Sequence, residues 1–192
     1  MKVFHGIESV KGLKKPVVAI GSFDGVHLGH VRILQHLHDT AKAMDGESVV
    51  ITFDPHPQVA LHPGNGFFVI NTLEENLRHI EAQGIDAVVI IPFTKAFSQL
   101  SYAEFLETMI VGKLKASALV MGPDHTLGHN REGNHSCIEK LCSQNNVQVV
   151  MLPELLLHEV GVRSTKIRNA ISEKRWQDVD EMLGYHYEAS TL

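Results

Sequence analysis

The sequence has little of what would place it at once in several protein classes. Its 192 residues include two cysteines, Cys137 and Cys142, which are too few for a disulfide framework and are expected to be free thiols in a cytoplasmic protein. Asp and Glu (22) outnumber Lys and Arg (17), so the composition carries no basic footprint for nucleic acid. No apolar run reaches the ~18 residues of a membrane span, and the first residues lack a signal-peptide core. We therefore expect a soluble protein with neither nucleic-acid nor membrane partners.

What the sequence does contain is an alternation of short apolar runs with segments of helical periodicity. The expected strands are 17–20, 48–53, 87–91, 118–121 and 147–152. The expected helices are 31–43, 73–83, 101–114, 135–145 and two short ones within 164–183. This order is typical of a parallel sheet built from βαβ units. It predicts one Rossmann-like α/β domain, a parallel sheet flanked by helices, with its site in the loops that follow the strands.

The most informative segment joins the first of these strands to the first of these helices. It reads Gly21-Ser22-Phe23-Asp24-Gly25-Val26-His27-Leu28-Gly29-His30. A glycine-rich loop at this place offers backbone N–H groups and a helix N-terminus to a phosphate. His27 and His30 can add imidazole donors, although exposed histidines beside a tight turn are the alternative. The sequence has no P-loop motif. His-x-Gly-His in this setting resembles the nucleotidyltransferase superfamily.

A second anion site is predicted at the start of a late helix, in Arg163-Ser164-Thr165-Lys166-Ile167-Arg168. Ser164 or Thr165 is expected to cap that helix, and Lys166 and Arg168 add positive charge. The alternative is an ordinary capped basic helix on the surface. In nucleotidyltransferases, Ser/Thr-x-x-Arg at a late helix start is a second clamp for the triphosphate.

Three further groups of residues have competing interpretations. His56, in the rigid segment 52–57 after a strand, can face a ligand or be structural. Trp176 is expected to pack in the core of the last helix. A zinc site is also compatible with the spacing among Asp124, His125, His129 and His135, although no cysteine pair supports it.

Taken together, these segments resemble the N-terminal adenylyltransferase domain of the bacterial bifunctional riboflavin kinase/FMN adenylyltransferases, also called FAD synthetases. Residues 21–30, 52–57, 71–84, 92–105 and 163–168 carry the resemblance, which covers nearly the whole chain. It implies an adenylyltransferase domain over 1–184 and a tail over 185–192 where a riboflavin kinase domain would begin. The kinase motif Pro-Thr-Ala-Asn does not occur. A piece of a longer protein and a stand-alone adenylyltransferase are both open.

The resemblance implies that the phosphate of FMN attacks the α-phosphate of ATP in line, giving FAD and pyrophosphate, with Mg²⁺ accompanying ATP. The catalytic residues would be His27, His30 and Arg168. The ATP phosphates would be bound by Gly21, Ser22, Phe23, Asp24, Gly25, Gly29, Ser164, Thr165 and Lys166. FMN would be bound by Thr52, Pro55, His56, Pro57, Asn71, Asp124, His125, Leu127 and Arg131. No side chain is assigned to a metal ion.

One loop departs from the family's pattern. The family usually has Gly-x-Asp-Phe-x-Phe-Gly where this chain has residues 122–128, with His125 and Leu127 in place of the aromatic residues. This departure bears on flavin affinity and predicts a high KM for FMN. It also leaves open a different acceptor, such as a phosphopantetheine-like compound or a pyridine mononucleotide, or a flavin- or nucleotide-binding module without activity.

Overall fold

Six parallel strands form the centre of the protein, which is described here from a computed structural model over residues 1–122, 125–152 and 161–188. Their order in the sheet is β1-β4-β3-β2-β5-β6, and every neighbouring pair is parallel. The strands are β1 Lys2–His5, β2 Val17–Ile20, β3 Ser48–Asp54, β4 Ala87–Pro92, β5 Ala118–Met121 and β6 Gln148–Met151. The four residues of β2 and those of β5 are all buried, which explains their continuous apolar sequence.

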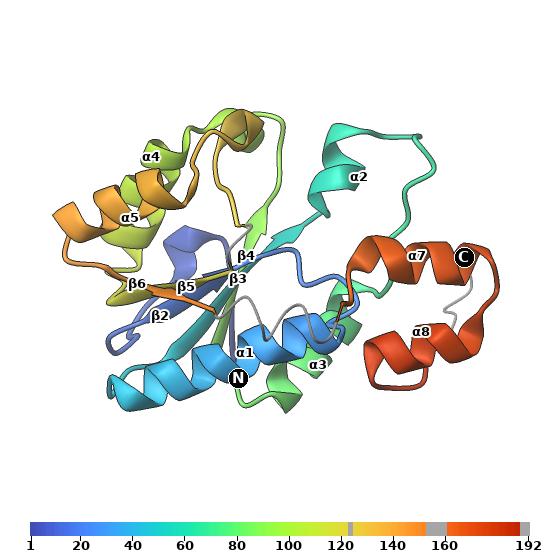
Figure 1. Cartoon of the computed structure of the whole chain (residues 1–192). Helices are drawn as coiled ribbons and strands as arrows, with labels where there is room; N and C mark the ends of the chain where they lie inside the picture. Colours follow the sequence, from blue (N-terminus) through green and yellow to red (C-terminus); the bar gives the residue numbers. More distant parts are fainter. Residues whose placement is uncertain (123–124, 153–160, 189–192) are drawn as a thin grey trace.

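Helices cover both faces of this sheet (Figure 1). They are α1 Leu28–Ala43, α2 Pro57–Leu61, α3 Leu73–Ala82, α4 Tyr102–Phe105, α5 His135–Gln144, α7 Ser164–Ser172 and α8 Trp176–Leu183. A π-helical segment, Leu106–Lys113, continues α4. Three single 3₁₀ turns are Ile7–Ser9, Phe97–Gln99 and His129–Arg131. Among the described residues, no helix combines the length and apolarity that crossing a bilayer requires.

Separate apolar cores lie on the two faces of the sheet. Val17 and Ala19 of β2 pack with Leu34 of α1 and Ile80 of α3. Their neighbours Val18 and Ile20 point to the other face and pack with α4, the π-helical segment and α5. A third, smaller core holds α7 and α8 against the segment before α3. These cores fix where each strand ends and therefore where the loops of the site begin.

The order of the strands reverses beside β2. From β2 the chain runs through β3 to β4 on one side of the sheet, and then returns to place β5 and β6 on the other side. The carboxyl ends of β2 and β5 therefore diverge into loops on opposite sides of one crevice. Such a switch point is where open α/β sheets bind their ligands.

The predicted Rossmann-like architecture is confirmed, with differences at the ends of elements. The edge strand β1 was not predicted, because its residues are mostly exposed and lack an apolar run. α1 begins at Leu28 instead of Val31, because the ring of His27 caps it by accepting the N–H of His30 at 3.3 Å. The segment expected to be a loop after β3 contains the short helix α2.

The expected place of Trp176 in the core is wrong. Its side chain is 45% exposed, whereas Val179 and Leu183 on the same helix are buried. The small core between α7 and α8 reaches only as far as Val179. Trp176 starts the helix one turn earlier and rests on the ring of Tyr187, with the ring centroids 6.4 Å apart.

Candidate active site

Asp24 connects the three segments that surround the predicted phosphate site. Its side chain is 2% exposed and accepts the backbone N–H of Ile70 at 2.9 and 3.1 Å and that of Asn71 at 3.3 Å. The same carboxylate forms an ion pair with the guanidinium of Arg168. A buried carboxylate is costly unless it is paired and hydrogen-bonded, so these donors must stay in place around Asp24. The loop after β2, the segment before α3 and helix α7 are therefore held in one arrangement.

Arg168 is held from three directions. Besides its ion pair with Asp24, its Nε donates to the carbonyl of Phe68 at 2.9 Å. Its guanidinium lies 4.2 Å from the centroid of the Phe67 ring, a cation–π contact. The sequence predicted a cation at this place, whereas its use as a link between loops is visible only in the structure.

The loop between β2 and α1 has a backbone that few residues tolerate. Gly25 has φ +78°, and a Cβ there would lie 2.9 Å from Ile70. Phe23 and Val26 also have positive φ angles, 46° and 33°. For a β-branched residue this conformation is strained, and it persists because both side chains are buried.

His27 and His30 stack on each other at the start of α1. Their ring centroids are 3.7 Å apart, with 14° between the ring planes. Because Nδ1 of His27 accepts the N–H of His30, the neutral ring of His27 carries its proton on Nε2. Burial, and to a lesser extent the charge of Arg168, lowers the pKa of His27 to about 4. Burial and the neighbouring His27 and Arg168 likewise lower the pKa of His30. Both rings are therefore neutral at pH 7 in this structure.

The start of α7 lies against the start of α1. A Cβ at Gly29 would be 3.5 Å from the carbonyl of Val162, just before α7. The predicted cap was wrong, because Arg163 is still extended and occupies the N-cap position, which makes Ser164 the first helical residue. The hydroxyl of Ser164 instead donates to the backbone carbonyl of Asp24 at 3.4 Å.

Thr165 and Lys166 are exposed in the first turn of α7. The ammonium of Lys166 donates to the carbonyl of Gly161 at 2.6 Å. Two helix N-termini thus meet beside the histidine pair. Their unpaired N–H groups and dipoles favour anions, so this arrangement can hold a polyphosphate.

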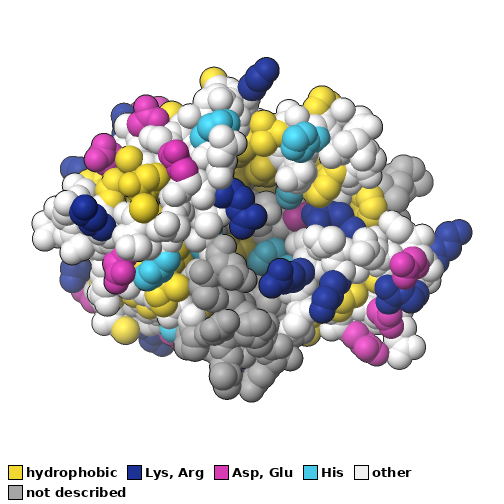
Figure 2. All heavy atoms as spheres, turned by 45° about the horizontal axis from the view of Figure 1, so that its top comes forward, with side chains coloured by type: hydrophobic (Ala, Val, Ile, Leu, Met, Phe, Trp, Pro, Cys, Tyr) yellow, Lys and Arg dark blue, Asp and Glu magenta, His cyan; other side chains and the backbone are white. Residues whose placement is uncertain are grey.

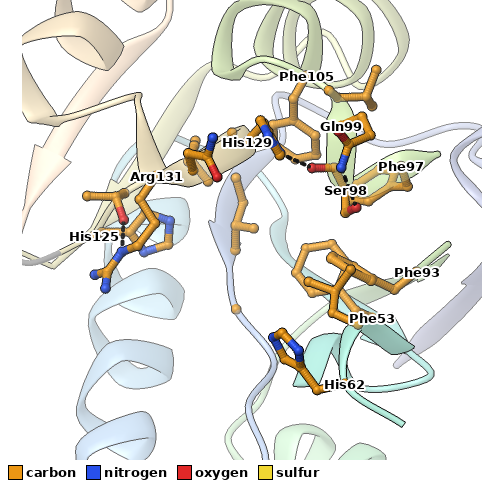
Figure 3. A pocket seen from close by; sticks show the side chains of 18 residues that line it. Phe53, His62, Phe93, Phe97, Ser98, Gln99, Phe105, His125, His129 and Arg131 are labelled. Atoms are coloured by element: carbon orange, nitrogen blue, oxygen red, sulfur yellow. Dashed lines mark hydrogen bonds between the residues drawn. The ribbon is translucent and has the colours of Figure 1, made fainter. Parts of the chain in front are cut away.

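A cavity of about 590 Å³ opens next to this cluster, at the carboxyl ends of β2, β3 and β4 (Figure 3). One wall is aromatic, with Phe53, Phe93, Phe97 and Phe105 contacting one another at ring-centroid distances between 5.4 and 6.0 Å. Residues 125–131, after β5, form the facing wall. Gly21 lines the cavity as well and begins the loop that carries the histidine pair. The volume is in the range of small-molecule sites.

In Figure 2, hydrophobic, histidine and Lys or Arg side chains gather around a hollow near the middle of the face shown. The lining of the cavity is likewise mixed, with His62, His125 and His129 among apolar residues. Burial lowers the pKa of His125 to about 4, so this ring too is neutral at pH 7.

The loop after β5 is held mainly through its backbone. Leu127 and Gly133 form an antiparallel bridge, with N–H to carbonyl distances of 3.0 and 2.9 Å. Gly128 has φ +83°, and a Cβ there would lie 2.4 Å from the backbone nitrogen of Tyr102. This close approach requires glycine and fixes the loop against α4.

The zinc hypothesis receives no support from the described residues, which contain no group of three or more His, Cys, Asp or Glu placed to hold a metal. His129 bonds through Nδ1 to the carbonyl of Ser98 at 3.2 Å. Nδ1 of His135 lies 3.8 Å from a carboxylate oxygen of Glu139. Asp124 lies outside the described residues.

The predicted flavin residues fall into two groups. His125, Leu127 and Arg131 line the cavity. Thr52 and His56 are not among the lining residues: Thr52 donates to the carbonyl of Ser22 at 3.1 Å, and His56 stacks on Phe67 with centroids 4.8 Å apart. Pro55 and Pro57 flank that histidine in sequence, and Pro57 begins α2.

Asn71 takes part in a hydrogen-bonded link, through Tyr185 to Gly25, that sequence reasoning missed. Its amide donates to the hydroxyl of Tyr185 at 2.7 Å, and this hydroxyl donates to the carbonyl of Gly25 at 2.7 Å. Sequence reasoning also did not assign the aromatic wall to ligand binding. The available signal was a phenylalanine at the end of one strand and a pair four residues apart after the next, Phe53, Phe93 and Phe97.

Known proteins similar to this chain identify its family. Residues 10–166 match the model of the FAD synthetase family. The chain is 31% identical over 192 residues to a bifunctional riboflavin kinase/FMN adenylyltransferase of Buchnera aphidicola subsp. Schizaphis graminum, covering 99% of this chain and 62% of that protein. It is 26% identical over 192 residues to the protein of the same name from Escherichia coli, covering 99% and 61%. The chain thus spans about 60% of the length of these relatives.

A solved structure has the same fold. The crystal structure of a protein described as a macrolide-efflux protein from Streptococcus pneumoniae superposes with a TM-score of 0.82, covering 97% of this chain and 72% of that chain. At 24% identity it bears on the fold alone. The family match extends over most of the domain and includes both loops of the site. The chain belongs to the FAD synthetase family.

Proposed function

We propose that this chain transfers the adenylyl group of ATP to FMN, forming FAD and pyrophosphate. One observation carries the proposal: the stacked pair His27 and His30, at the meeting of two helix N-termini, adjoins a phenylalanine-lined cavity. The first part suits a triphosphate and the second suits a flat aromatic ring system. Both belong to the switch point of one sheet, so a bound acceptor and a bound nucleotide can meet there.

The reaction asks for positioning and for charge neutralisation. An oxygen of the FMN phosphate forms a bond to the α-phosphorus of ATP, and the bond from that phosphorus to the bridging oxygen of the β-phosphate breaks. Pyrophosphate leaves with the electron pair, so neither a covalent enzyme intermediate nor an obligatory proton transfer is needed. Fixed donors aimed at the phosphate oxygens are then the main source of rate enhancement.

His27 and His30 are the proposed donors. Their rings are neutral at pH 7, and in His27 the proton on Nε2 is free to be donated because Nδ1 serves the helix cap. A triphosphate bound beside them favours the charged form and raises both pKa values. The pair can therefore strengthen its hydrogen bonds as negative charge develops on the transferred group.

α7 supplies the other side of the proposed ATP site. Thr165 and Lys166 are exposed in its first turn and suit the β- and γ-phosphates. Arg168 contributes its positive charge from behind, while its contacts with Asp24 and Phe68 hold the two loops together. Ser164 links α7 to the loop after β2 through the carbonyl of Asp24.

Mg²⁺ is proposed to arrive with ATP and to be coordinated by phosphate oxygens and water. The donor set of the protein fits this arrangement, because the carboxylate of Asp24 is already occupied by Ile70, Asn71 and Arg168. Mg²⁺ commonly keeps several waters and binds through substrate phosphates. Its role at this site would be to neutralise the charge of the triphosphate.

The test is to incubate the purified chain with ATP, Mg²⁺ and FMN and to detect FAD by chromatography. We expect FAD only when all three are present, and no FMN from riboflavin and ATP. Without FAD at saturating FMN, adenylyl transfer to a phosphopantetheine-like compound or a pyridine mononucleotide identifies another acceptor. Nucleotide binding without any transfer identifies a binding module.

A further inference from the structure

Arg131 has a fixed anchor on one side and an accessible guanidinium on the other. Its Nε donates to the hydroxyl of Thr126 at 2.9 Å. Arg131 and Asn130 both have positive φ angles, 58° and 53°, an uncommon pair of consecutive conformations for residues with side chains. Such local strain is concentrated at ligand sites, where it aims a side chain. Arg131 is exposed and lines the cavity.

The guanidinium of Arg131 differs in charge from the other described residues around the cavity. Among the described residues that line it, Arg131 is the only Lys, Arg, Asp or Glu. Figure 3 shows Arg131 next to His125, across the cavity from Phe53 and Phe93. Because burial keeps the ring of His125 neutral at pH 7, it does not supply the charge. A charged group opposite an aromatic wall suits a ligand that is flat and apolar at one end and anionic at the other.

We propose that Arg131 binds the phosphate of the acceptor, the group that attacks ATP. This inference rests on the proposed adenylyl transfer and adds to it one specific contact. The planar fork of a guanidinium matches two phosphate oxygens at once. The histidine pair and the start of α7 hold the nucleotide from one side of the switch point. Arg131 presents the acceptor phosphate from the loop after β5, on the other side.

The test compares two flavins that differ only in the phosphate. FMN and riboflavin are titrated separately into the whole chain, without ATP, and binding is followed by flavin fluorescence. We expect the unmodified chain to prefer FMN. Arg131→Gln should weaken FMN binding by about ten- to a hundredfold, the range for one charge-assisted hydrogen-bonded contact, and leave riboflavin binding unchanged. Arg131→Lys should restore part of the preference.

Two further variants control for charge and folding. Lys140→Gln removes the same charge from an exposed position on α5 and should leave the preference for FMN intact. Thr126→Val removes only the Nε anchor and should reduce the preference less than Arg131→Gln does. This variant keeps the test valid even if Arg131→Gln does not fold.

The outcomes separate this inference from the proposed function. If Arg131→Gln weakens FMN and riboflavin equally, or neither, while the unmodified chain still prefers FMN, the role of Arg131 is overturned and the proposed function stands. If the unmodified chain binds neither flavin, the proposed function fails and this inference fails with it. In turnover, the inference requires a raised KM for FMN with an unchanged KM for ATP.

Discussion

The loops after β2 and β5 border the same crevice, yet they are built in opposite ways. The loop after β2 is fastened by the buried carboxylate of Asp24 to two other segments, one of them 144 residues away in sequence. The loop after β5 is held by a two-residue backbone bridge and by contacts with the start of α4, and its Arg131 is exposed. The loop after β2 is pre-organised by a buried charge. The loop after β5 is held mainly by its backbone, so its side chains can be replaced without loss of its shape.

This difference agrees with what each loop is proposed to do. Stabilising charge on a transferred phosphate depends on donors that do not have to reorganise, which favours a rigid, cross-linked loop. Recognition of the acceptor is set by the side chains that line the cavity. The departure from the family's pattern, at His125 and Leu127, lies in the second loop and leaves the first intact.

The largest effect should follow from breaking the rigid loop. Asp24→Asn leaves the half-buried guanidinium of Arg168 without its carboxylate partner, and we expect a loss of about 3–5 kcal/mol in the free energy of unfolding. Urea denaturation measures this loss. Asp178→Asn removes an exposed carboxylate that also pairs with an arginine, and it should change stability little. Equal effects of the two variants would show that the Asp24 ion pair does not organise the loop.

Acidification should distinguish the two loops next. The pKa of His27 is lowered from 6.5 to about 4 by burial, so unfolding takes up a proton between these values. Stability is fully present above about pH 6.5 and falls as the pH decreases toward 4, by at most about 1.4 kcal/mol per pH unit for each such ring. The measurement is urea denaturation between pH 7.5 and pH 5.

Variants assign this pH dependence to one loop or the other. His27→Gln should reduce the slope of the unfolding free energy against pH by nearly the contribution of one proton. His125→Gln should reduce that slope less, although burial lowers the pKa of His125 to about 4 as well, because its loop lacks the buried ion pair that cross-links the loop after β2 and can expose the ring before global unfolding. An equal loss for both variants would mean that the two loops open together.

His30 should separate catalysis from binding. If it stabilises charge on the transferred phosphate, His30→Ala lowers kcat by about 10²-fold or more and affects the KM for ATP much less. His38→Ala is the matched control on the same helix, where Nδ1 of the ring hydrogen-bonds to the carbonyl of Gly84 at 3.0 Å. Normal turnover of His30→Ala would make this histidine a turn residue only.

The smallest expected effect concerns the loop after β5 and its proposed contact with FMN. Replacing both His125 and Leu127 by Phe restores the family's aromatic pattern opposite the wall of Phe53 and Phe93. Each added aromatic contact is worth about 0.5–1.5 kcal/mol, so the KM for FMN should fall by about tenfold, and the KM for ATP should stay the same. Steady-state kinetics with each substrate varied in turn gives both constants. An unchanged KM for FMN would mean that this loop does not contact the flavin.

The sequence by itself was sufficient for the architecture, and it singled out the loop after β2 as a candidate site. The strands from β2 to β5 are recognisable because strands buried on both faces are continuously apolar. The capping boxes at Thr72 and Ser101 place the starts of two helices, because their hydrogen bonds are local. The loop with His27 and His30 stands out because His27 caps the following helix through the N–H of His30, a contact within four residues of sequence.

Only the tertiary structure decided how distant residues cooperate. The pairing of Asp24 with Arg168, the link of Asn71 through Tyr185 to Gly25, and the aromatic wall of the cavity all join segments far apart in the chain. No local pattern specifies these contacts, because they depend on the order of the strands and on how α7 docks against α1. The exposed position of Trp176 has the same origin, since an apolar periodicity shows which face of a helix is hydrophobic but not how far the neighbouring core extends.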